Sequence, residues 1–211
     1  MDADDSIELG PSAPALELPW RDPQGRLLYI DLRASAGAIQ QALNAIPEAV
    51  QFPALRRFLL ELNSAPSVWQ TAKCDVWSEA VEAAENLYDA PFAHSCYVDL
   101  VLVHTASRDS LGLHQRIARE MARLLEANTT LEASAEIVVR RCYFHHVASI
   151  DRAPSSTALC SANRMAEESD AGYCLTQFLT GYGRSPAEAQ EGWEQALDFA
   201  VACWLKVRTI E

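Results

Sequence analysis

The sequence places one thiol and two imidazoles within a single short segment, Cys142-Tyr143-Phe144-His145-His146. Thiolate and neutral imidazole are good zinc ligands, and a zinc site needs three or four protein ligands. On an extended strand, Cys142 and His146 share one face while His145 points to the other. The other ligand-type residues lie on separate segments: His94, His104, Cys74 and Cys96. Because one face of the segment supplies too few ligands, we predict no metal site.

Cys142 is also the candidate for a cysteine nucleophile. Such catalysis needs a thiol that a neighbouring base or cation activates. Arg140 and Arg141 precede Cys142, and the two histidines follow it. No protease or phosphatase signature surrounds this thiol, and an unreactive cysteine buried in a strand is the alternative interpretation. The candidate catalytic residues are Cys142, His145 and His146, and a small metal-dependent or Cys/His hydrolase stays an alternative function.

Serine and phosphate chemistry find less support in the sequence. It contains no G-x-S-x-G nucleophile elbow. Gly181-Tyr182-Gly183 lacks the spacing of a dinucleotide-binding or Walker loop, and we interpret Gly183 as the turn from a strand into a helix. The sequence therefore predicts no cofactor.

Two strand–helix units position these residues. Alternating apolar side chains predict a strand over 96–104, and helical spacing of apolar side chains predicts an amphipathic helix over 110–125. The same pattern predicts a strand over 174–182 and a helix over 186–205. Aligning Cys96 with Cys174 indicates an internal duplication, although any strand–helix pair gives a similar pattern.

The second helix has the clearest start in the chain. Ser185 can accept a hydrogen bond from the first turn, Pro186 stands where its missing N–H costs nothing, and Glu188 completes a capping box.

Strands over 68–77 and 135–147 complete the expected core. The order strand, strand, helix, strand, strand, helix predicts an α+β fold, with one antiparallel four-stranded sheet and both helices on one face. This order resembles ferredoxin-like split sandwiches in architecture alone. Residues 78–90 suit a short helix or an acidic connection, and 151–172 have no clear period.

The N-terminal part precedes this core. Residues 1–14 are acidic and predict a flexible tail. Alternating apolar residues around Asp22-Pro23-Gln24-Gly25 predict a hairpin over 16–32. We expect two helices after it, one capped by Ser35 and stopped by Pro47, the other opened by Pro53. The predicted single domain covers 15–211, with an N-terminal part at 15–66 and the sheet-and-helix core at 67–211.

Composition limits the function further. The 211 residues are 49% hydrophobic and carry a formal net charge of -12, which argues against general nucleic-acid binding. No apolar run is long enough to span a bilayer, and no segment has the pattern of a signal peptide. The cysteines form no C-x-x-C pair, so we expect reduced thiols in a soluble cytoplasmic protein without membrane contact.

Three functions remain open. We favour a non-enzymatic binding or assembly protein that forms a homo-oligomer, because strand aromatics such as Trp69, Trp77 and Tyr97 occur without a catalytic signature. The hydrolase is one alternative. The other is an acidic immunity- or inhibitor-type protein that holds a basic partner, since opposite charges speed association.

Overall fold

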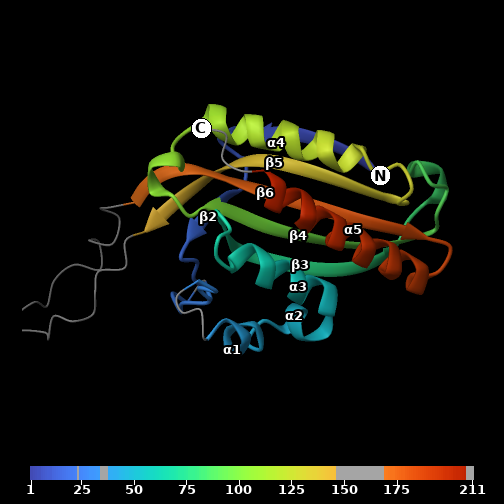
Figure 1. Ribbon diagram of the computed structural model, residues 1–211, viewed down its shortest axis with the longest axis horizontal. Helices are drawn as coiled ribbons and strands as arrows, with labels where there is room; N and C mark the ends of the chain where they lie inside the picture. Colours follow the sequence, from blue (N-terminus) through green and yellow to red (C-terminus); the bar gives the residue numbers. More distant parts are fainter. Residues whose placement is uncertain (23, 34–37, 146–168, 208–211) are drawn as a thin grey trace, which may run out of the picture.

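A six-stranded mixed sheet forms the centre of the computed structural model, which describes residues 1–22, 24–33, 38–145 and 169–207 (Figure 1). The strands are β1 (Asp2–Glu8), β2 (Ala15–Leu18), β3 (Trp69–Ala80), β4 (Phe92–Leu102), β5 (Ala133–His145) and β6 (Ser169–Gly183). Their order is β1-β5-β6-β4-β3, and β2 also pairs with β5. The strands β3 to β6 pair antiparallel, whereas β1 and β2 run parallel to β5.

The predicted α+β class is confirmed, but the purely antiparallel four-stranded sheet is wrong. The two additional strands come from the N-terminal part of the chain and make the sheet mixed. The predicted order of strand, strand, helix, repeated once, is present from β3 onward.

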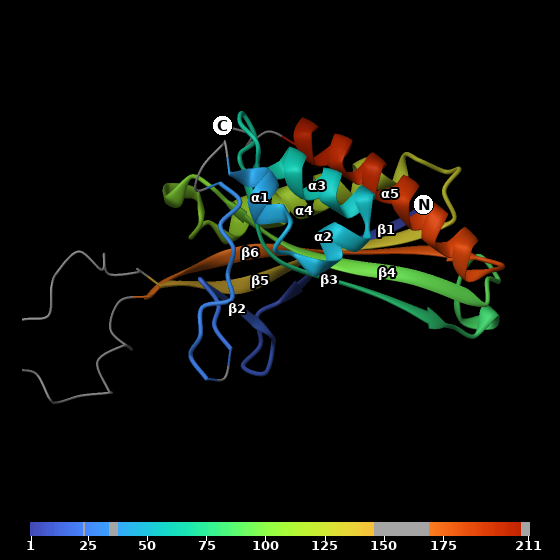
Figure 2. The ribbon, with the colours of Figure 1, turned by 90° about the horizontal axis from the view of Figure 1, so that it is seen from below.

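Five α-helices lie on one side of this sheet (Figure 2). They are α1 (Ile39–Leu43), α2 (Pro47–Gln51), α3 (Pro53–Asn63), α4 (Leu111–Glu126) and α5 (Pro186–Lys206). Short 3₁₀ turns occupy Ala83–Glu85 and Thr105–Ser107. Among the described residues, no helix has the length and apolar character needed to cross a membrane.

Both long helices begin at a serine cap. The Ser110 hydroxyl accepts a hydrogen bond from the Leu113 N–H at 3.3 Å, and Ser185 does the same for Glu188 at 3.3 Å. The Glu188 carboxylate accepts from the Arg184 N–H at 2.8 Å, one residue before the position that a capping box uses. The predicted start of α5 is thus confirmed, with a shifted reciprocal bond.

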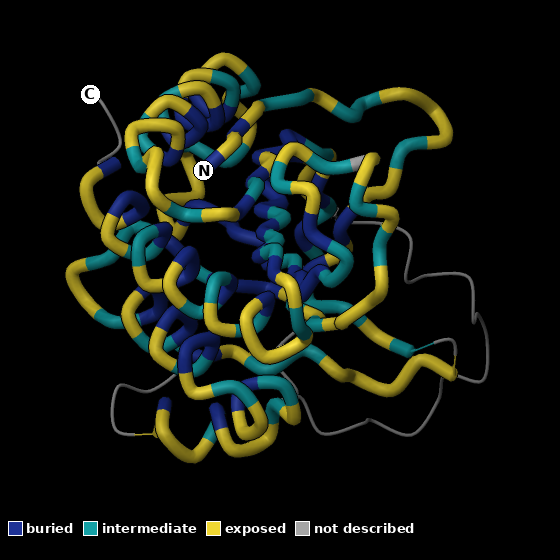
Figure 3. Tube along the Cα trace, turned by 90° about the vertical axis from the view of Figure 1, so that its right-hand side faces the viewer, coloured by how far each residue is buried: buried dark blue, intermediate teal, exposed yellow. Residues whose placement is uncertain are grey.

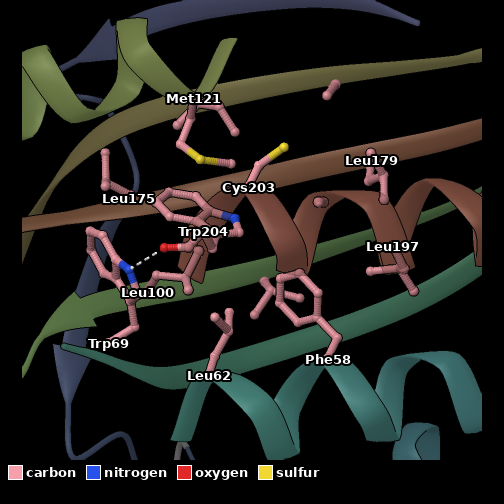
Figure 4. Close-up of a cluster of buried hydrophobic side chains, with 14 of the residues drawn as sticks. Phe58, Leu62, Trp69, Leu100, Met121, Leu175, Leu179, Leu197, Cys203 and Trp204 are labelled. Atoms are coloured by element: carbon pink, nitrogen blue, oxygen red, sulfur yellow. Dashed lines mark hydrogen bonds between the residues drawn. The ribbon is translucent and has the colours of Figure 1, made fainter. Parts of the chain in front are cut away.

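The core lies between the helices and the sheet. Trp69 of β3 and Trp204 of α5 pack edge to face, with ring centroids 4.8 Å apart, and the Trp69 indole donates to the Trp204 carbonyl at 3.2 Å (Figure 4). The Trp204 indole donates in turn to Gln177 of β6. Along the chain trace, the buried residues lie inside and the exposed ones on outer turns and loops (Figure 3).

The first strand is a correction to the predicted tail. Residues Asp2–Glu8 pair with Ser134–Arg140 of β5, and Ala3 is buried. Asp5 faces α4 and lies 3.9 Å from the Arg119 guanidinium. The acidic side chains stay at the surface while the backbone completes the sheet edge, so acidity here does not imply flexibility.

The predicted hairpin over 16–32 is replaced by another pairing. Residues Ala15–Leu18 pair with β5, and only an isolated bridge joins Arg21 to Leu27. The turn itself forms, because the Asp22 carboxylate accepts from the N–H groups of Gln24 and Arg26 at 3.0 and 2.8 Å. A neighbouring strand of the sheet thus competes successfully with the local turn.

Three further expectations change in the structure. Pro47 opens α2 instead of only ending the preceding helix, whereas Pro53 opens α3 as predicted. The acidic stretch after Trp77 first continues β3 to Ala80 and then forms a 3₁₀ turn. Ser35, and most of the segment 151–172, lie outside the described residues.

A bulge alters which side chains of β3 share a face. The register shifts between Thr71 and Lys73, so Ala72 is the extra residue. Trp69 therefore lies on the helix side, while Trp77 lies on the opposite side, whereas an uninterrupted strand would place both on one face.

The duplicated units are similar in plan but not in the predicted register. Cys96 pairs with Leu179 and lies in the core beneath the helices, whereas Cys174 lies in a smaller cluster on the other side of the sheet. Aligning the two cysteines therefore places residues of opposite faces together.

Candidate functional site on the open face of the sheet

The side of the sheet that faces away from the helices is called the open face here. The strand register sets its side chains in rows that run across β1, β5, β6, β4 and β3. One row is Asp2, Ser134, Thr180, Ser95 and Trp77. The next row is Asp4, Glu136, Phe178, Tyr97 and Asp75. A third is Ser6, Val138, Thr176, Asp99 and Lys73.

Aromatic side chains occupy the middle of the open face. The rings of Tyr97 and Phe178 stand opposite each other with centroids 6.0 Å apart. Trp77 on β3 is 38% exposed, which is high for an indole in a strand. Tyr182 continues the series and stacks on Tyr88 at 5.3 Å between centroids. Partly exposed aromatic groups that gather on one face of a sheet are typical of recognition surfaces.

Trp77, Tyr97, Phe178 and Tyr182 together are called the aromatic strip. Carboxylates lie at both edges of the sheet beside it. Asp4 and Glu136 are exposed at the β1 edge, and Asp75 and Glu79 are exposed at the β3 edge. Among the described residues none of these four forms an ion pair; Glu136 accepts a hydrogen bond from Ser6 at 2.7 Å. The negative charge of the two edges is therefore available to a ligand.

A charged network lies half-buried beside the strip. Asp99 is only 7% exposed and accepts a hydrogen bond from the Thr176 hydroxyl at 2.5 Å. Burial raises the pKa of Asp99 despite this bond and the nearby charges of Arg140 and Lys73. Arg140 donates to Thr176 at 3.3 Å and pairs with Glu8, and its guanidinium lies 5.2 Å from the Phe178 ring centroid.

Two further charge relationships lie in and beside this network. Lys73 stands opposite Asp99 in the pairing of β3 with β4, whereas Asp75 stands opposite Tyr97. On the helix side of the sheet, Arg119 of α4 lies 3.9 Å from Asp5 of β1.

At the other end of the open face, β2 pairs with β5 and contributes two leucines to a second apolar cluster. Leu16, Leu18, Phe144 and Val101 bury the thiols of Cys142 and Cys174, both 0% exposed. A hydrogen bond with Cys142, followed by burial, raises the pKa of the Cys174 thiol well above its usual range. Thiols in this state are poor nucleophiles at neutral pH.

The predicted catalytic residues are not brought together. Cys142 lies on the open face, whereas His145 lies on the opposite side of β5, with its Nε2 3.7 Å from a Glu17 carboxylate oxygen. His146 lies outside the described residues. Within the described part of the chain, no group of three His, Cys, Asp or Glu side chains could hold a metal ion.

One serine–histidine contact escaped the sequence analysis. The Ser78 hydroxyl lies 2.6 Å from His94 Nδ1, and the ring of His94 packs against Phe52 and Trp193. Its other nitrogen, Nε2, is buried and meets no hydrogen-bond partner within the described ranges. Among the described residues no carboxylate forms a hydrogen bond with this imidazole, so the pair lacks the arrangement of a hydrolytic triad.

The aromatic strip could have been found only in part from the sequence. Trp77 and Tyr97 were expected as binding residues, and both lie on the open face. Phe178 was missed because its strand was interpreted only as an apolar core element. Alternation in the β6 sequence was the available signal, since Thr176, Phe178 and Thr180 share a face.

No protein-family model, curated protein or solved structure matches this chain.

Proposed function

We propose that the chain is a non-enzymatic binding protein that holds a basic polypeptide on its open face. The observation that carries this proposal is the row Asp4, Glu136, Phe178, Tyr97 and Asp75, in which carboxylates flank two aromatic rings. A guanidinium or ammonium group can lie over an aromatic face and pair with a carboxylate at the same time.

The surrounding charges support a cationic partner. Lys73 is the basic member of the three rows defined above, and it stands opposite the carboxylate of Asp99. The formal net charge of -12 acts in the same direction over a longer range. A negatively charged surface accelerates the approach of a basic partner and repels an acidic one.

The free energy of a single surface contact is small, so binding of a basic peptide needs several contacts. One exposed ion pair contributes only about 0.2–1 kcal/mol, and one exposed cation–π contact contributes about 0.5–1 kcal/mol. Several contacts must therefore act together, which the repeated spacing across the strands allows. Five strands span about 20 Å, the length of a short extended peptide.

An arginine-rich peptide of about ten residues that alternates Arg with Ala tests the proposal, because it spans the sheet. Fluorescence anisotropy at about 0.02 M and about 0.3 M salt should give strong binding at the lower value and weak binding at the higher value. The same peptide with Glu in place of Arg should not bind.

A matched pair of variants locates the site. Combining Asp4→Asn, Glu136→Gln and Asp75→Asn should weaken binding about tenfold or more. The control, which combines Glu61→Gln, Glu126→Gln and Glu191→Gln, removes three exposed carboxylates from α3, α4 and α5 on the other side. It should weaken binding less than about twofold. Equal losses in both variants would contradict the open face as the binding site.

Self-association is the second candidate, because β3 is an edge strand. Asp75–Ala80 pair with β4 on one side and with no strand on the other in the described sheet. Such an edge can pair with a second copy of the chain. Light scattering over a wide concentration range would show a dimer; a monomer throughout would remove this candidate and leave the basic-partner proposal standing.

A further inference from the structure

A cavity of about 290 Å³ opens at the edge of the sheet, next to the β3 bulge. Its walls come from the segment before α1, from the α1–α2 connection, from the start of α2, from α3 and from β3. The segment from Trp20 to Arg33 passes from one side of the sheet to the other beside β3 (Figure 2). Lys73 connects the cavity to the aromatic side chains of the open face, because its ammonium lies 5.9 Å from the Tyr97 ring centroid.

The interior of the cavity is apolar. Its main wall residues are Trp20, Leu28, Ile30, Leu32, Ile46 and Leu59. Burial, together with nearby acidic groups, raises the pKa of the Cys74 thiol in the wall to about 12, so this thiol is neutral at physiological pH. The lining therefore suits a hydrocarbon or aromatic group, because apolar walls offer no hydrogen bond or opposite charge to a buried charged group.

The size of the cavity limits what can enter. A cavity of roughly 150 Å³ is enough to take up benzene. The present one has about twice that volume, at about 290 Å³. A single ring or a branched alkyl group fits, together with a small polar head at the entrance.

Two opposite charges lie at this cavity. Lys73 and Glu48 both contribute to its lining. Lys73 stands opposite Asp99 in the sheet, and neither Lys73 nor Glu48 forms an ion pair with a described residue. The Lys73 ammonium lies 5.4 Å from the Trp20 ring centroid and 5.9 Å from that of Tyr97. Glu48 is close enough to Cys74 and Tyr97 to raise the pKa of both.

The walls beside the charges are held in place before any ligand arrives. The Trp20 indole donates to the carbonyl of the bulged Ala72 at 3.2 Å. Asn63 accepts from the Thr71 N–H at 3.0 Å and donates to its hydroxyl at 2.7 Å. A preformed site avoids the entropy that ordering side chains would cost on binding.

From these features we infer that the cavity binds an apolar α-amino acid in its zwitterionic form. The side chain of the ligand enters the cavity, its carboxylate faces Lys73 and its ammonium faces Glu48. Each of the two charges in the cavity lining thereby gains an opposite partner. A ligand with one charged group would leave the other protein charge unpaired beside it.

Three ligands that share a benzene ring test the inference: L-phenylalanine, 3-phenylpropanoate and 2-phenylethylamine. Calorimetric titration of the full chain should find L-phenylalanine bound about tenfold more tightly than either ligand with one charge, the equivalent of one charge-assisted contact. Equal affinity for 3-phenylpropanoate would overturn the zwitterionic site. No binding of any of the three would overturn the cavity as an amino-acid site.

Two substitutions separate the two ends of the ligand. Lys73→Gln should abolish the preference for L-phenylalanine over the amine, and Glu48→Gln should abolish the preference over the carboxylate. Glu61→Gln serves as the control and should change neither. The comparison of ligands on the unaltered chain decides the question even where a variant folds poorly. The arginine-peptide measurement is independent, so either proposal can fail alone.

Discussion

Arg140 and Glu8 form an ion pair, with Nη2 2.7 Å from Oε2, although 132 residues separate them in the chain. The pair joins β1 to its neighbouring strand β5, in which Arg140 is the register partner of Glu8. The Arg140 side chain is only 16% exposed. Because water reaches it poorly, the guanidinium is stabilised by this partner more than a surface arginine would be.

Replacing Glu8 by Gln should lower the free energy of unfolding by about 1 kcal/mol, because the half-buried guanidinium loses its opposite charge. Urea unfolding followed by circular dichroism measures the change. The control Glu61→Gln should shift it by less than about 0.5 kcal/mol. A null result for Glu8→Gln would mean that this ion pair contributes little to the stability of the fold.

Trp69 and Trp77 belong to one strand, but replacing each by Ala should affect different properties: stability for Trp69 and peptide binding for Trp77. Trp69→Ala removes a side chain that is 1% exposed and should cost about 3–5 kcal/mol of unfolding free energy. Trp77→Ala should cost less than about 1 kcal/mol and should weaken binding of the arginine peptide instead. Chemical denaturation and anisotropy on the same preparations separate the two effects. Similar destabilisation by both would place Trp77 in the core.

Gly181 supports the close approach of α5 to β6. A Cβ atom at this position would meet the backbone of Trp193 and of Ala189. Gly181→Ala should therefore cost about 2 kcal/mol or more, since backbone atoms move less easily than side chains. Gly112 is the matched control in α4, because a Cβ there meets only Arg116 Nη1 at 3.9 Å. Gly112→Ala should stabilise the chain by about 0.5–1 kcal/mol, measured as a rise in Tm.

The buried histidines predict a loss of stability in mild acid. Burial lowers the pKa of His94, against the opposite effect of Glu194, and lowers that of His114 as well. Below about pH 6.5 the unfolded chain binds protons that the folded chain does not, so the unfolding free energy falls as the pH falls.

Urea unfolding at about pH 7, 6 and 5 should show this decline. His94→Gln and His114→Gln should each flatten it, whereas His104→Gln, at an exposed position, should leave the slope unchanged. An unchanged slope in both buried variants would show that other groups control the acid sensitivity.

Local patterns predicted the central elements well. Alternation and helical spacing identified β4, α4, β6 and α5 because each buries one face against the same core. Ser110 and Ser185 fixed where the two long helices begin, through hydrogen bonds that involve only neighbouring residues.

Long-range pairing explains what the sequence left open. The acidic sequence of β1 did not indicate a strand, because this strand is stabilised by its pairing with the distant β5. Likewise, β2 pairs with β5 and not with the segment that follows its own turn. The bulge at Ala72 reversed the faces of β3 beyond it, which single-residue alternation could not reveal. Cys142 and His145 share a segment but not a face, so proximity in sequence gave no shared site.

The position of β1 has a consequence during protein synthesis. Asp2–Glu8 leave the ribosome long before their partner Ser134–Arg140 exists, so this segment must wait without a neighbour. Its aspartates repel other nascent chains and discourage premature strand pairing. We therefore expect these negative charges to lower the tendency of the segment to aggregate until the matching strand emerges.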